Sequence, residues 1–365
     1  MRFVFAALTS ILLFLTILSA SHAQSVREMA GQMVMIGFQH KSANADAHKK
    51  LLSLVKSGQV GGVMYLKYNV ASLKAVSGMN ASLQKAAPRG APLLIAIDQE
   101  GGVVERLTSA VGFKEIPKAR DVALNMNKDS ALALYSDLGQ RMAKLGFNVN
   151  FGPVVDLIVN QQNPIIAKYG RSFSSKSDIV TKFAISFIDG HNRAGMLTSL
   201  KHFPGHGSSK ADSHLGFVDI SNTWVEKEYE PFQALITAGK ADMIMAGHLF
   251  HKGYQRQGEP QVPASLSPVA LTTVLREGMG FDGVVISDDM EMGAITKHYG
   301  FEEAIIRAVN AGNDILLYSN TVKPSLNLPA KVLDVLEAEA ARDPAFRARI
   351  EQSYNRIIRM KQRLN

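Results

Sequence analysis

The sequence predicts an α/β fold, a single-domain (β/α)8 barrel of the TIM type with extra helices at its C-terminal end. Eight short apolar runs alternate with segments of helical periodicity, which is the pattern of a parallel sheet covered by helices on both faces. No stretch rich in Pro, Gly or Ser divides the chain into two domains. No Gly-x-Gly-x-x-Gly fingerprint follows the first run, which disfavours the alternative of an open doubly wound sheet.

The expected strands are the short apolar runs, taken in chain order. They cover residues 34–36, 62–66, 93–97, 148–151, 197–200, 243–246, 284–287 and 315–318. Between most of them, apolar residues recur at helical spacing. These helical segments cover residues 51–57, 70–86, 131–145, 179–193, 225–238, 268–277 and 302–311. The tail at 330–363 is rich in Ala, Leu, Glu and Arg and predicts two closing helices that break near Asp343-Pro344.

The first 23 residues have the pattern of a secretory signal peptide. Arg2 precedes an apolar run at 3–18, and Ser21 and Ala23 occupy the −3 and −1 positions of a cleavage site. The alternative is a retained membrane anchor, but the run is short for a full span. We therefore expect cleavage after Ala23, export to the periplasm or the medium, and a mature domain of residues 24–365 without stable membrane insertion.

Composition narrows the function classes. The 365 residues are 46% hydrophobic and 20% charged, which excludes an intrinsically disordered chain. The absence of Cys excludes disulfides, thiolate nucleophiles and Cys-ligated metal sites. The formal net charge is +8, yet the sequence has no run of five basic residues and no interleaving of basic and aromatic residues. We therefore expect no nucleic-acid partner, whereas attraction to an anionic cell-wall polymer stays open.

Polar side chains gather directly after five of the expected strands. The carboxyl ends of barrel strands share one face, and barrel enzymes build their active sites there. This shared position favours an enzyme over a set of unrelated structural roles. The residues that stand there are Asp98, Arg106, Arg171, Lys201, His202, Asp212, His214, His248 and Asp288.

Single members of this set also have structural interpretations. Asp98 alone could orient a loop, and for His248 alone we favour a packed core histidine. Lys201 and His202 are harder to explain in this way. Polar groups that end an apolar strand lose hydration unless they meet a ligand or a partner.

Two chemistries could use these residues. Metal-dependent hydrolysis has enough ligand types, although their spacing matches no specific metal motif. The ligand candidates are His202, His206, Asp212, His214 and His248. Glycoside hydrolysis needs a carboxylate that attacks the sugar carbon and a second group that protonates the leaving oxygen.

For glycoside hydrolysis, Asp288 fits the attacking carboxylate, and no second carboxylate is an evident proton donor. His214 could donate the proton instead, with Asp212 two residues earlier orienting its imidazole. Arginines and Lys201 would supply directed donors for sugar hydroxyl or acetamido groups.

The motifs resemble glycoside hydrolase family 3, and most of all its single-domain β-N-acetylglucosaminidases (β-N-acetylhexosaminidases) of the peptidoglycan-recycling type. The similarity runs in order from about residue 29 to residue 320, which is nearly the whole mature chain. The matching stretches are IDQEGG at 97–102, KHFPGHG at 201–207, DSH at 212–214, PAS at 263–265 and GFDGVVISDDM at 280–290.

The resemblance implies a (β/α)8 barrel and a retaining double displacement through a glycosyl-enzyme. It implies Asp288 as the nucleophile and His214, on a mobile loop and paired with Asp212, as the acid/base. It also implies that a terminal GlcNAc is held by Asp98, Arg106, Arg171, Lys201 and His202.

Two features depart from the family pattern. The family's GGRVQR reads GGVVER at 101–106, so Val103 replaces an arginine while Arg106 is kept. The Gram-negative recycling enzymes that the chain resembles act in the cytoplasm, whereas a signal peptide would place this protein outside the inner membrane.

The expected function is an exported exo-β-N-acetylhexosaminidase that uses no metal and no organic cofactor. Its expected substrates are peptidoglycan fragments (muropeptides) or related GlcNAc-containing glycans. A β-glucosidase-like hydrolase and a GlcNAc phosphorylase on the same barrel are alternatives. A catalytically silent glycan-binding barrel is a third, although Asp288 and the Asp212–His214 pair are intact.

Overall fold

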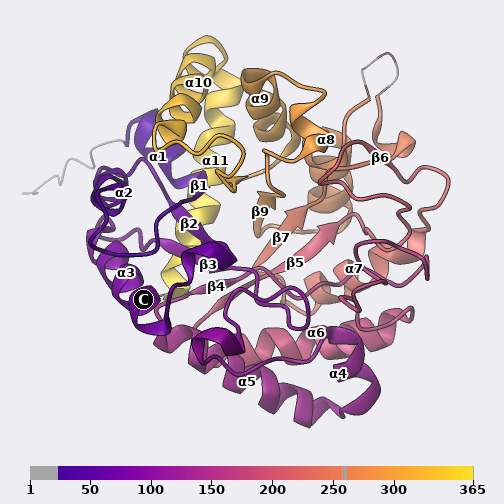
Figure 1. The fold of residues 1–365 in the computed structure, drawn as a ribbon. Coiled ribbons are helices and arrows are strands. Elements are labelled where there is room, and N and C mark those ends of the chain that lie inside the picture. Colours follow the sequence, from indigo (N-terminus) through magenta and orange to yellow (C-terminus); the bar gives the residue numbers. More distant parts are fainter. Residues whose placement is uncertain (1–23, 257, 259–260, 365) are drawn as a thin grey trace, which may run out of the picture.

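A ring of eight parallel strands forms the centre of the computed structural model, in the order β10-β1-β2-β3-β4-β5-β7-β9 (Figure 1). The ring closes where Ile286 and Ile315 form a parallel bridge, and the Ser287 N–H donates to the Ile315 carbonyl at 2.9 Å. The predicted (β/α)8 barrel is therefore confirmed. The strands are β1 (Val34–Gly37), β2 (Gly62–Tyr65), β3 (Leu94–Ile97), β4 (Val149–Asn150), β5 (Leu197–Phe203), β7 (Met243–Ala246), β9 (Val284–Ser287) and β10 (Leu316–Tyr318).

The structure describes residues 24–256, 258 and 261–364. The signal peptide predicted at 1–23 lies outside these described residues. Within them, no helix combines the length and the apolar character that crossing a membrane requires.

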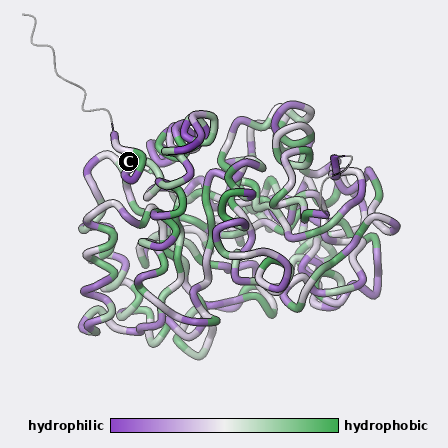
Figure 2. Tube along the Cα trace, turned by 90° about the horizontal axis from the view of Figure 1, so that it is seen from above, coloured by the Kyte–Doolittle hydropathy of each residue, from purple (hydrophilic) through white to green (hydrophobic). Residues whose placement is uncertain are grey.

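Helices cover the outside of the ring (Figure 1). Along them, hydrophilic and hydrophobic residues alternate (Figure 2), as expected of helices that pack one side against a sheet. They are α1 (Val26–Gln32), α2 (Asp46–Lys56), α3 (Leu73–Ala86), α4 (Ala119–Asn125), α5 (Lys128–Lys144), α6 (Ser177–Asn192), α7 (Glu230–Thr237), a π-helix (Val269–Gly278), α8 (Gly293–Thr296), α9 (Phe301–Ala311), α10 (Leu328–Arg342) and α11 (Pro344–Lys361). Short 3₁₀ turns and a small parallel pair, β6 (Val218–Asp219) with β8 (Leu249–Phe250), complete the fold.

All eight predicted strands occur, with ends that differ by three residues at most. The largest difference is in β5, which continues through Lys201 and His202 to Phe203. After a shift of register beyond Leu200, Phe203 still pairs with Ala246 of β7. Lys201 and His202 therefore belong to strand β5 itself, rather than to the loop after it.

The predicted break between the last two helices is confirmed. Helix α10 ends at Arg342, and the Asp343 carboxylate accepts the Ala345 N–H at 2.8 Å as the N-cap of α11. Helices α1, α4 and α8 were not predicted from the sequence, because their four to seven residues are too few to show a clear periodic pattern.

Candidate active site

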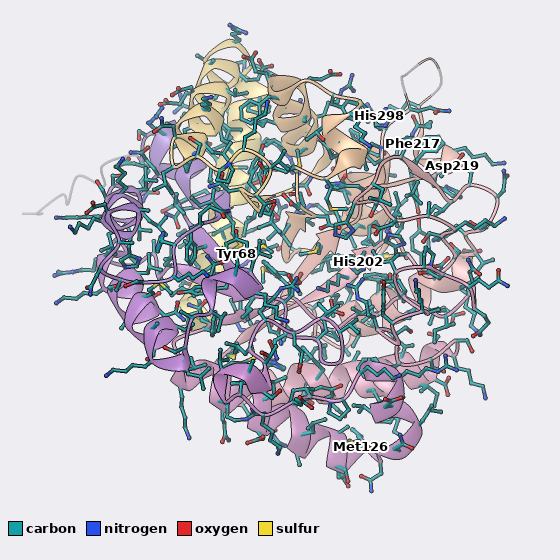
Figure 3. All side chains as sticks on the ribbon, viewed as in Figure 1. Tyr68, Met126, His202, Phe217, Asp219 and His298 are labelled. Atoms are coloured by element: carbon teal, nitrogen blue, oxygen red, sulfur yellow. The ribbon has the colours of Figure 1, made fainter. Side chains whose placement is uncertain are left out.

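A pocket of about 330 Å³ opens at the carboxyl ends of the strands. In Figure 3, His202 lies near the end of strand β5. Seven of the eight residues predicted to act on the substrate line this pocket: Asp98, Arg106, Arg171, Lys201, His202, His214 and Asp288. Asp212, the eighth, contacts His214. The fold thus brings together side chains that are up to 190 residues apart in sequence, from Asp98 to Asp288.

A cluster of buried charged side chains links β3, the loop after β4, and β5. The Lys201 Nζ lies 2.7 Å from Asp98 Oδ1 and 2.7 Å from Glu100 Oε1. The Arg171 guanidinium donates to both Glu100 carboxylate oxygens, at 2.9 and 2.8 Å. The Arg106 Nη2 lies 3.2 Å from Asp98 Oδ2. Three cations therefore meet two carboxylates, and the group keeps one positive charge in excess.

These pairs hold the groups in their charged forms. Burial alone would raise the pKa of Asp98, but the attraction of Lys201 and Arg106 brings it below its usual value. Burial alone would lower the pKa of Lys201, but Asp98 and Glu100 raise it above its usual value. Arg171 and Lys201 likewise hold the pKa of Glu100 well below its usual range, against the effect of burial.

Asp156, in the segment after β4, fixes His202. Its Oδ2 lies 2.8 Å from His202 Nδ1, and its Oδ1 accepts the backbone N–H groups of His202 and His206 at 3.0 and 2.8 Å. Since the carboxylate accepts the Nδ1 proton, His202 offers Nε2 to a ligand.

Asp288 is the first residue after β9. Its N–H donates to the Ala246 carbonyl of β7 at 3.0 Å, and its Oδ1 accepts the Asp289 N–H at 2.8 Å. Burial would raise the pKa of Asp288, but the nearby His248, His202 and His214, with the Asp289 N–H, together lower it to about 2. The carboxylate is therefore ionised at neutral pH, as attack on a sugar carbon requires.

His248, at the end of β7, holds the backbone beside Asp288. Its Nε2 donates to the Asp289 carbonyl at 3.0 Å, and its Nδ1 lies 2.7 Å from Ser265 Oγ. Burial lowers the pKa of His248, so the neutral ring donates from Nε2 and accepts the Ser265 hydroxyl at Nδ1. The residue is 1% exposed, as a core histidine would be, and its contacts also fix the position of the neighbouring carboxylate.

His214 and Asp212 form a hydrogen-bonded pair between β5 and β6. His214 Nδ1 lies 2.6 Å from Asp212 Oδ1, which also accepts the His214 N–H at 2.9 Å. The His214 side chain is 60% exposed, at the mouth of the pocket. Because Asp212 accepts the Nδ1 proton, Nε2 is the atom that can exchange a proton with a ligand.

The loop that carries His214 is fastened to α8 and the turn after it. The Gly293 N–H donates to the His214 carbonyl at 3.2 Å, and the Lys297 ammonium donates to the Leu215 carbonyl at 2.7 Å. The Phe217 ring packs edge-on against His298, with centroids 5.6 Å apart (Figure 3). Helix α8 begins five residues after Asp288, so these contacts join the two predicted catalytic segments.

His206 holds the base of the same loop and is not free to bind metal. Its Nδ1 lies 2.6 Å from Ser209 Oγ, and its Nε2 lies 3.3 Å from Ser213 Oγ. In the part of the chain that the structure describes, no group of three or more His, Asp or Glu side chains is placed to hold a metal ion.

Sequence reasoning missed two buried carboxylates of the site. Glu100 pairs with Lys201 and Arg171, and Asp156 holds His202. Their positions in the sequence could have identified them, because both follow predicted strands, as Asp98 and Asp288 do. The contacts show that both carboxylates orient neighbouring side chains, and that Glu100 also lines the pocket whereas Asp156 does not.

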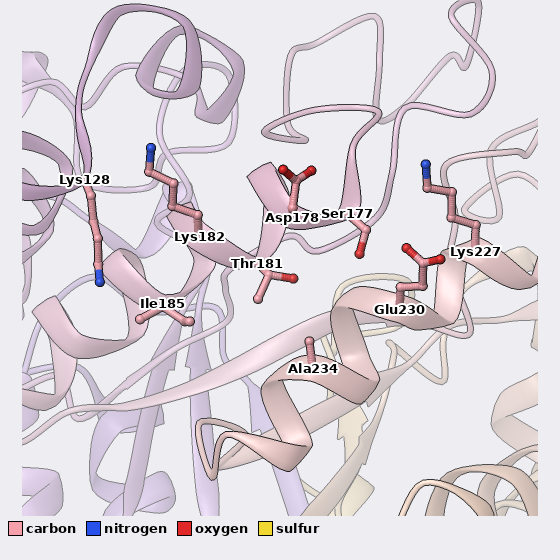
Figure 4. A pocket seen from close by; sticks show the side chains of 9 residues that line it. All are labelled: Lys128, Ser177, Asp178, Thr181, Lys182, Ile185, Lys227, Glu230 and Ala234. Atoms are coloured by element: carbon pink, nitrogen blue, oxygen red, sulfur yellow. The ribbon is translucent and has the colours of Figure 1, made fainter.

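A larger hollow, of about 640 Å³, lies on the outer layer beside α6 and α7 (Figure 4). Its lining includes Lys182, Lys227 and Glu230, and none of the nine lining residues belongs to the predicted set. The hollow lies among the covering helices rather than at the carboxyl ends of the strands. We therefore place the site in the smaller pocket, where the predicted residues meet.

Comparison with known proteins shows the family of the chain. The family model described as "Glycosyl hydrolase family 3 N terminal domain" matches residues 25–360. Beta-hexosaminidase LpqI of Mycobacterium tuberculosis is 34% identical over 347 residues, which cover 92% of this chain and 83% of that protein. Beta-hexosaminidase A of Pseudoalteromonas piscicida is 31% identical, and the match covers 96% of this chain but only 64% of that longer protein.

A solved structure resembles the whole fold. The beta-N-acetylhexosaminidase of Beutenbergia cavernae superposes with a TM-score of 0.83 at 28% identity, covering 93% of this chain and 99% of that one. The closed barrel and the polar pocket at its strand ends, with these matches, define a glycoside hydrolase. The chain belongs to glycosyl hydrolase family 3.

Proposed function

We propose that this glycoside hydrolase is a retaining exo-β-N-acetylhexosaminidase, which releases a terminal GlcNAc through a glycosyl-enzyme. One observation carries the proposal: a single pocket holds the ionised Asp288 and, at its mouth, the His214–Asp212 pair. Relatives that cover most of the chain are named beta-hexosaminidase and beta-N-acetylhexosaminidase, which supports GlcNAc as the sugar.

In the first step, an Asp288 carboxylate oxygen attacks the anomeric carbon and forms a covalent ester with the sugar. The bond from that carbon to the leaving oxygen breaks, and its electron pair stays on the oxygen. His214 Nε2 donates a proton to this oxygen, so the aglycone leaves as a neutral alcohol. Asp212, 2.6 Å from Nδ1, orients the ring throughout.

In the second step, water attacks the anomeric carbon of the glycosyl-enzyme. His214 Nε2 takes a proton from this water, and the Asp288 carboxylate leaves. The two displacements restore the β configuration and return both side chains to their starting protonation states.

The cluster of buried charged side chains, together with His202, would bind the sugar. Asp98 accepts hydrogen bonds from hydroxyl groups, and Arg106, Arg171, Lys201 and His202 donate them. Lys201 and Arg171 are already fixed by Glu100, so little side-chain freedom is lost when a sugar binds.

We further propose that the natural substrates are peptidoglycan fragments and that the protein is exported. The signal peptide pattern at residues 1–23 supports export, and the resemblance of the sequence motifs to peptidoglycan-recycling enzymes supports the substrate class. The positive charge of the chain suits the anionic peptides of such fragments.

The test is hydrolysis of an aryl β-N-acetylglucosaminide by residues 24–365 of the parent chain and by two variants. We expect an active parent and an inactive Asp288→Ala. We expect His214→Ala to be impaired by about 10²-fold or more on poor leaving groups and less on activated ones. Full activity of Asp288→Ala would overturn the mechanism.

Two further arms of this experiment separate the alternatives. An arylglucoside cleaved in place of the GlcNAc substrate would support the β-glucosidase-like alternative. A sugar 1-phosphate formed when phosphate is added would support the phosphorylase.

A further inference from the structure

The net positive charge of the mature chain belongs to two neighbouring helices and their loops. Residues 41–97 contain eight Lys or Arg and a single acidic residue, Asp46, so this segment has a formal charge of +7. Residues 98–365 contain 30 Lys or Arg and 30 Asp or Glu, so their formal charges cancel. Arg27 and Glu28 cancel in the same way. One short segment therefore holds all of the excess, and such an asymmetry is typical of a surface that attracts anions.

Helices α2 and α3 place five of these cations in solvent. Lys49, Lys50 and Lys56 of α2 are exposed, and so are Lys74 and Lys85 of α3. The opposite side of each helix packs on the barrel through buried apolar residues. The two helices are neighbours on one side of the ring, so their lysines share one surface (Figure 1).

Three further cations extend this surface at the helix ends. Lys41 lies in the loop after β1, Lys67 follows β2, and Arg89 follows α3, and all three are exposed. We call the eight basic residues of 41–97 the cationic face. Within the described residues, only Lys49 of this face forms an ion pair, with Asp46 at 2.9 Å. The other seven cations are therefore available to an anionic partner.

The cationic face has no apolar anchor. No large apolar side chain between residues 24 and 97 is exposed. Helices that sink into the interface of a bilayer present an exposed apolar side to it. The cationic face is two helices wide, and α3 alone has 14 residues, a length of about 21 Å. It therefore suits a broad anionic surface that is held by charge alone.

The start of the mature chain lies at the edge of the cationic face. Gln24, the first described residue, lines one hollow together with Lys56 and Arg89. The signal peptide predicted at 1–23 would cross a bilayer during export, so its cleavage would release Gln24 at the bilayer surface. The cationic face would then lie beside the lipid headgroups, which favours a membrane over a soluble polymer as its partner.

We infer that the cationic face binds the surface of an anionic phospholipid bilayer without inserting into it. Each ammonium or guanidinium group that comes within the Debye length of the lipid phosphates, about 8 Å in physiological salt, strengthens the attraction. The helices run along the side of the barrel, whereas the catalytic pocket opens at the strand ends, so binding leaves the pocket accessible. Only the choice of a bilayer as the partner rests on the proposed export.

The test is co-sedimentation of residues 24–365 with lipid vesicles. One set contains equal parts of phosphatidylglycerol and phosphatidylcholine, and the other contains phosphatidylcholine alone. We expect binding to the anionic vesicles only, and weaker binding as salt is added. The triple variant Lys50→Gln, Lys74→Gln, Lys85→Gln is expected to bind the anionic vesicles at least about 10-fold more weakly. Because Gln and Lys have similar helix propensities, the fold should be kept.

The matched control is the triple variant Lys128→Gln, Lys182→Gln, Lys227→Gln, which removes the same charge from exposed lysines elsewhere. These three line the hollow beside α6 and α7, where Asp178 and Glu230 lie among them (Figure 4). The control should change vesicle binding by less than about 2-fold, because attraction across more than a Debye length is screened. Both triple variants should cleave an aryl β-N-acetylglucosaminide at the parent rate.

Two results would overturn the inference: no binding of the parent to anionic vesicles, or equal weakening in the two triple variants. Retention of the parent by an insoluble anionic polysaccharide but not by vesicles would also overturn it, and would assign the cationic face to a polymer. The assay needs no catalysis, so Asp288→Ala should bind vesicles as the parent does. A parent that binds vesicles but cleaves no glycoside would overturn the proposed function and leave this inference standing.

Discussion

Lys201 remains charged although its side chain is only 2% exposed, because Asp98 and Glu100 each lie 2.7 Å from its ammonium group. Removing such a cation leaves two carboxylates buried and facing each other, which costs more than the pairs themselves contribute. The sugar therefore meets donors and acceptors that are fixed and balanced before it binds. At the scale of single residues, recognition and local stability depend on the same contacts.

Asp212 is expected to affect the rate only for substrates whose leaving group must be protonated. In Asp212→Asn, the carboxylate 2.6 Å from His214 Nδ1 loses its charge, and the ring loses both orientation and basicity. We expect kcat/KM to fall by about 10-fold to 100-fold for disaccharides and much less for a nitrophenyl glycoside. Steady-state kinetics on both substrates measures this difference.

Asp219→Asn is the control for that prediction. Asp219 lies on β6 after the same loop, and its carboxylate accepts the Ser221 N–H at 2.8 Å (Figure 3). The same chemical change there should leave both substrates unaffected. A parallel loss on both substrates in Asp212→Asn would contradict a role in proton transfer.

Ser265 is expected to position Asp288 through His248. In Ser265→Ala, the buried His248 Nδ1 loses the hydroxyl that donates to it, which we expect to lower the free energy of unfolding by about 1–3 kcal/mol. The ring can then turn away from the Asp289 carbonyl, so kcat should fall several-fold while KM changes little. Urea unfolding and steady-state kinetics test the two parts. A fall in stability without any change in kcat would show that Ser265 stabilises the fold but does not position Asp288.

At the scale of elements, helix α1 shows how a short segment is held by its first residues. The Ser25 hydroxyl accepts the Glu28 N–H at 3.2 Å, and the Glu28 carboxylate accepts the Ser25 N–H at 2.8 Å. The cleavage site predicted after Ala23 leaves this capping box intact in the mature chain.

Ser25→Ala is expected to lower the free energy of unfolding by about 1 kcal/mol, because it removes the hydroxyl that accepts the Glu28 N–H at the start of α1. Ser130→Ala, an exposed serine inside the first turn of α5, should change stability by less than about 0.5 kcal/mol. Thermal unfolding of both variants at one pH measures the difference. Equal shifts would show that the Ser25 cap contributes nothing.

At the scale of the whole molecule, two of the buried groups with strongly shifted pKa values make stability depend on pH. The Lys361 ammonium, at the end of α11, donates to Gln32 Oε1 and the Gly61 carbonyl at 2.7 and 2.8 Å, and burial lowers its pKa to about 7. Glu228 accepts the Gly207 N–H at 3.0 Å, and burial raises its pKa to about 7. The two shifts act in adjacent pH windows.

Between pH 7 and 10.5, the unfolded chain binds a proton at Lys361 that the folded chain does not, so the free energy of unfolding should rise with pH. Between pH 4.5 and 7, the folded chain keeps a proton on Glu228 that the unfolded chain loses, so the contribution of Glu228 falls as pH rises. Each slope is at most about 1.4 kcal/mol per pH unit.

Lys361→Met is expected to remove the contribution of Lys361 to the rise above pH 7. Glu228→Gln is expected to reduce the fall below pH 7, to which Asp289, with a pKa raised by burial to about 6, also contributes. Urea unfolding across both windows checks the prediction, and each variant serves as the control for the other. If neither substitution alters the slope in its own window, these groups titrate alike in the folded and unfolded states.

Much of this arrangement follows from local sequence. The eight strands are visible because strands covered on both faces read as continuous apolar runs, such as LIAI in β3 and VVIS in β9. Polar residues directly after these runs lie on one face of any barrel. The sequence alone therefore places Asp98 and Asp288 on the same face. The break before α11 is equally local, since Asp343 and Pro344 are adjacent.

The sequence by itself determined the barrel, the family and the residues that reach the pocket, because periodicity, strand ends and motifs are properties of neighbouring residues. Only the tertiary structure decided how those residues share charge: that Glu100 binds both Lys201 and Arg171, and that Asp156 fixes His202. Such pairings depend on distances between side chains that are far apart in the chain. Electrostatic attraction in a buried site changes steeply with those distances, and only the closed barrel sets them.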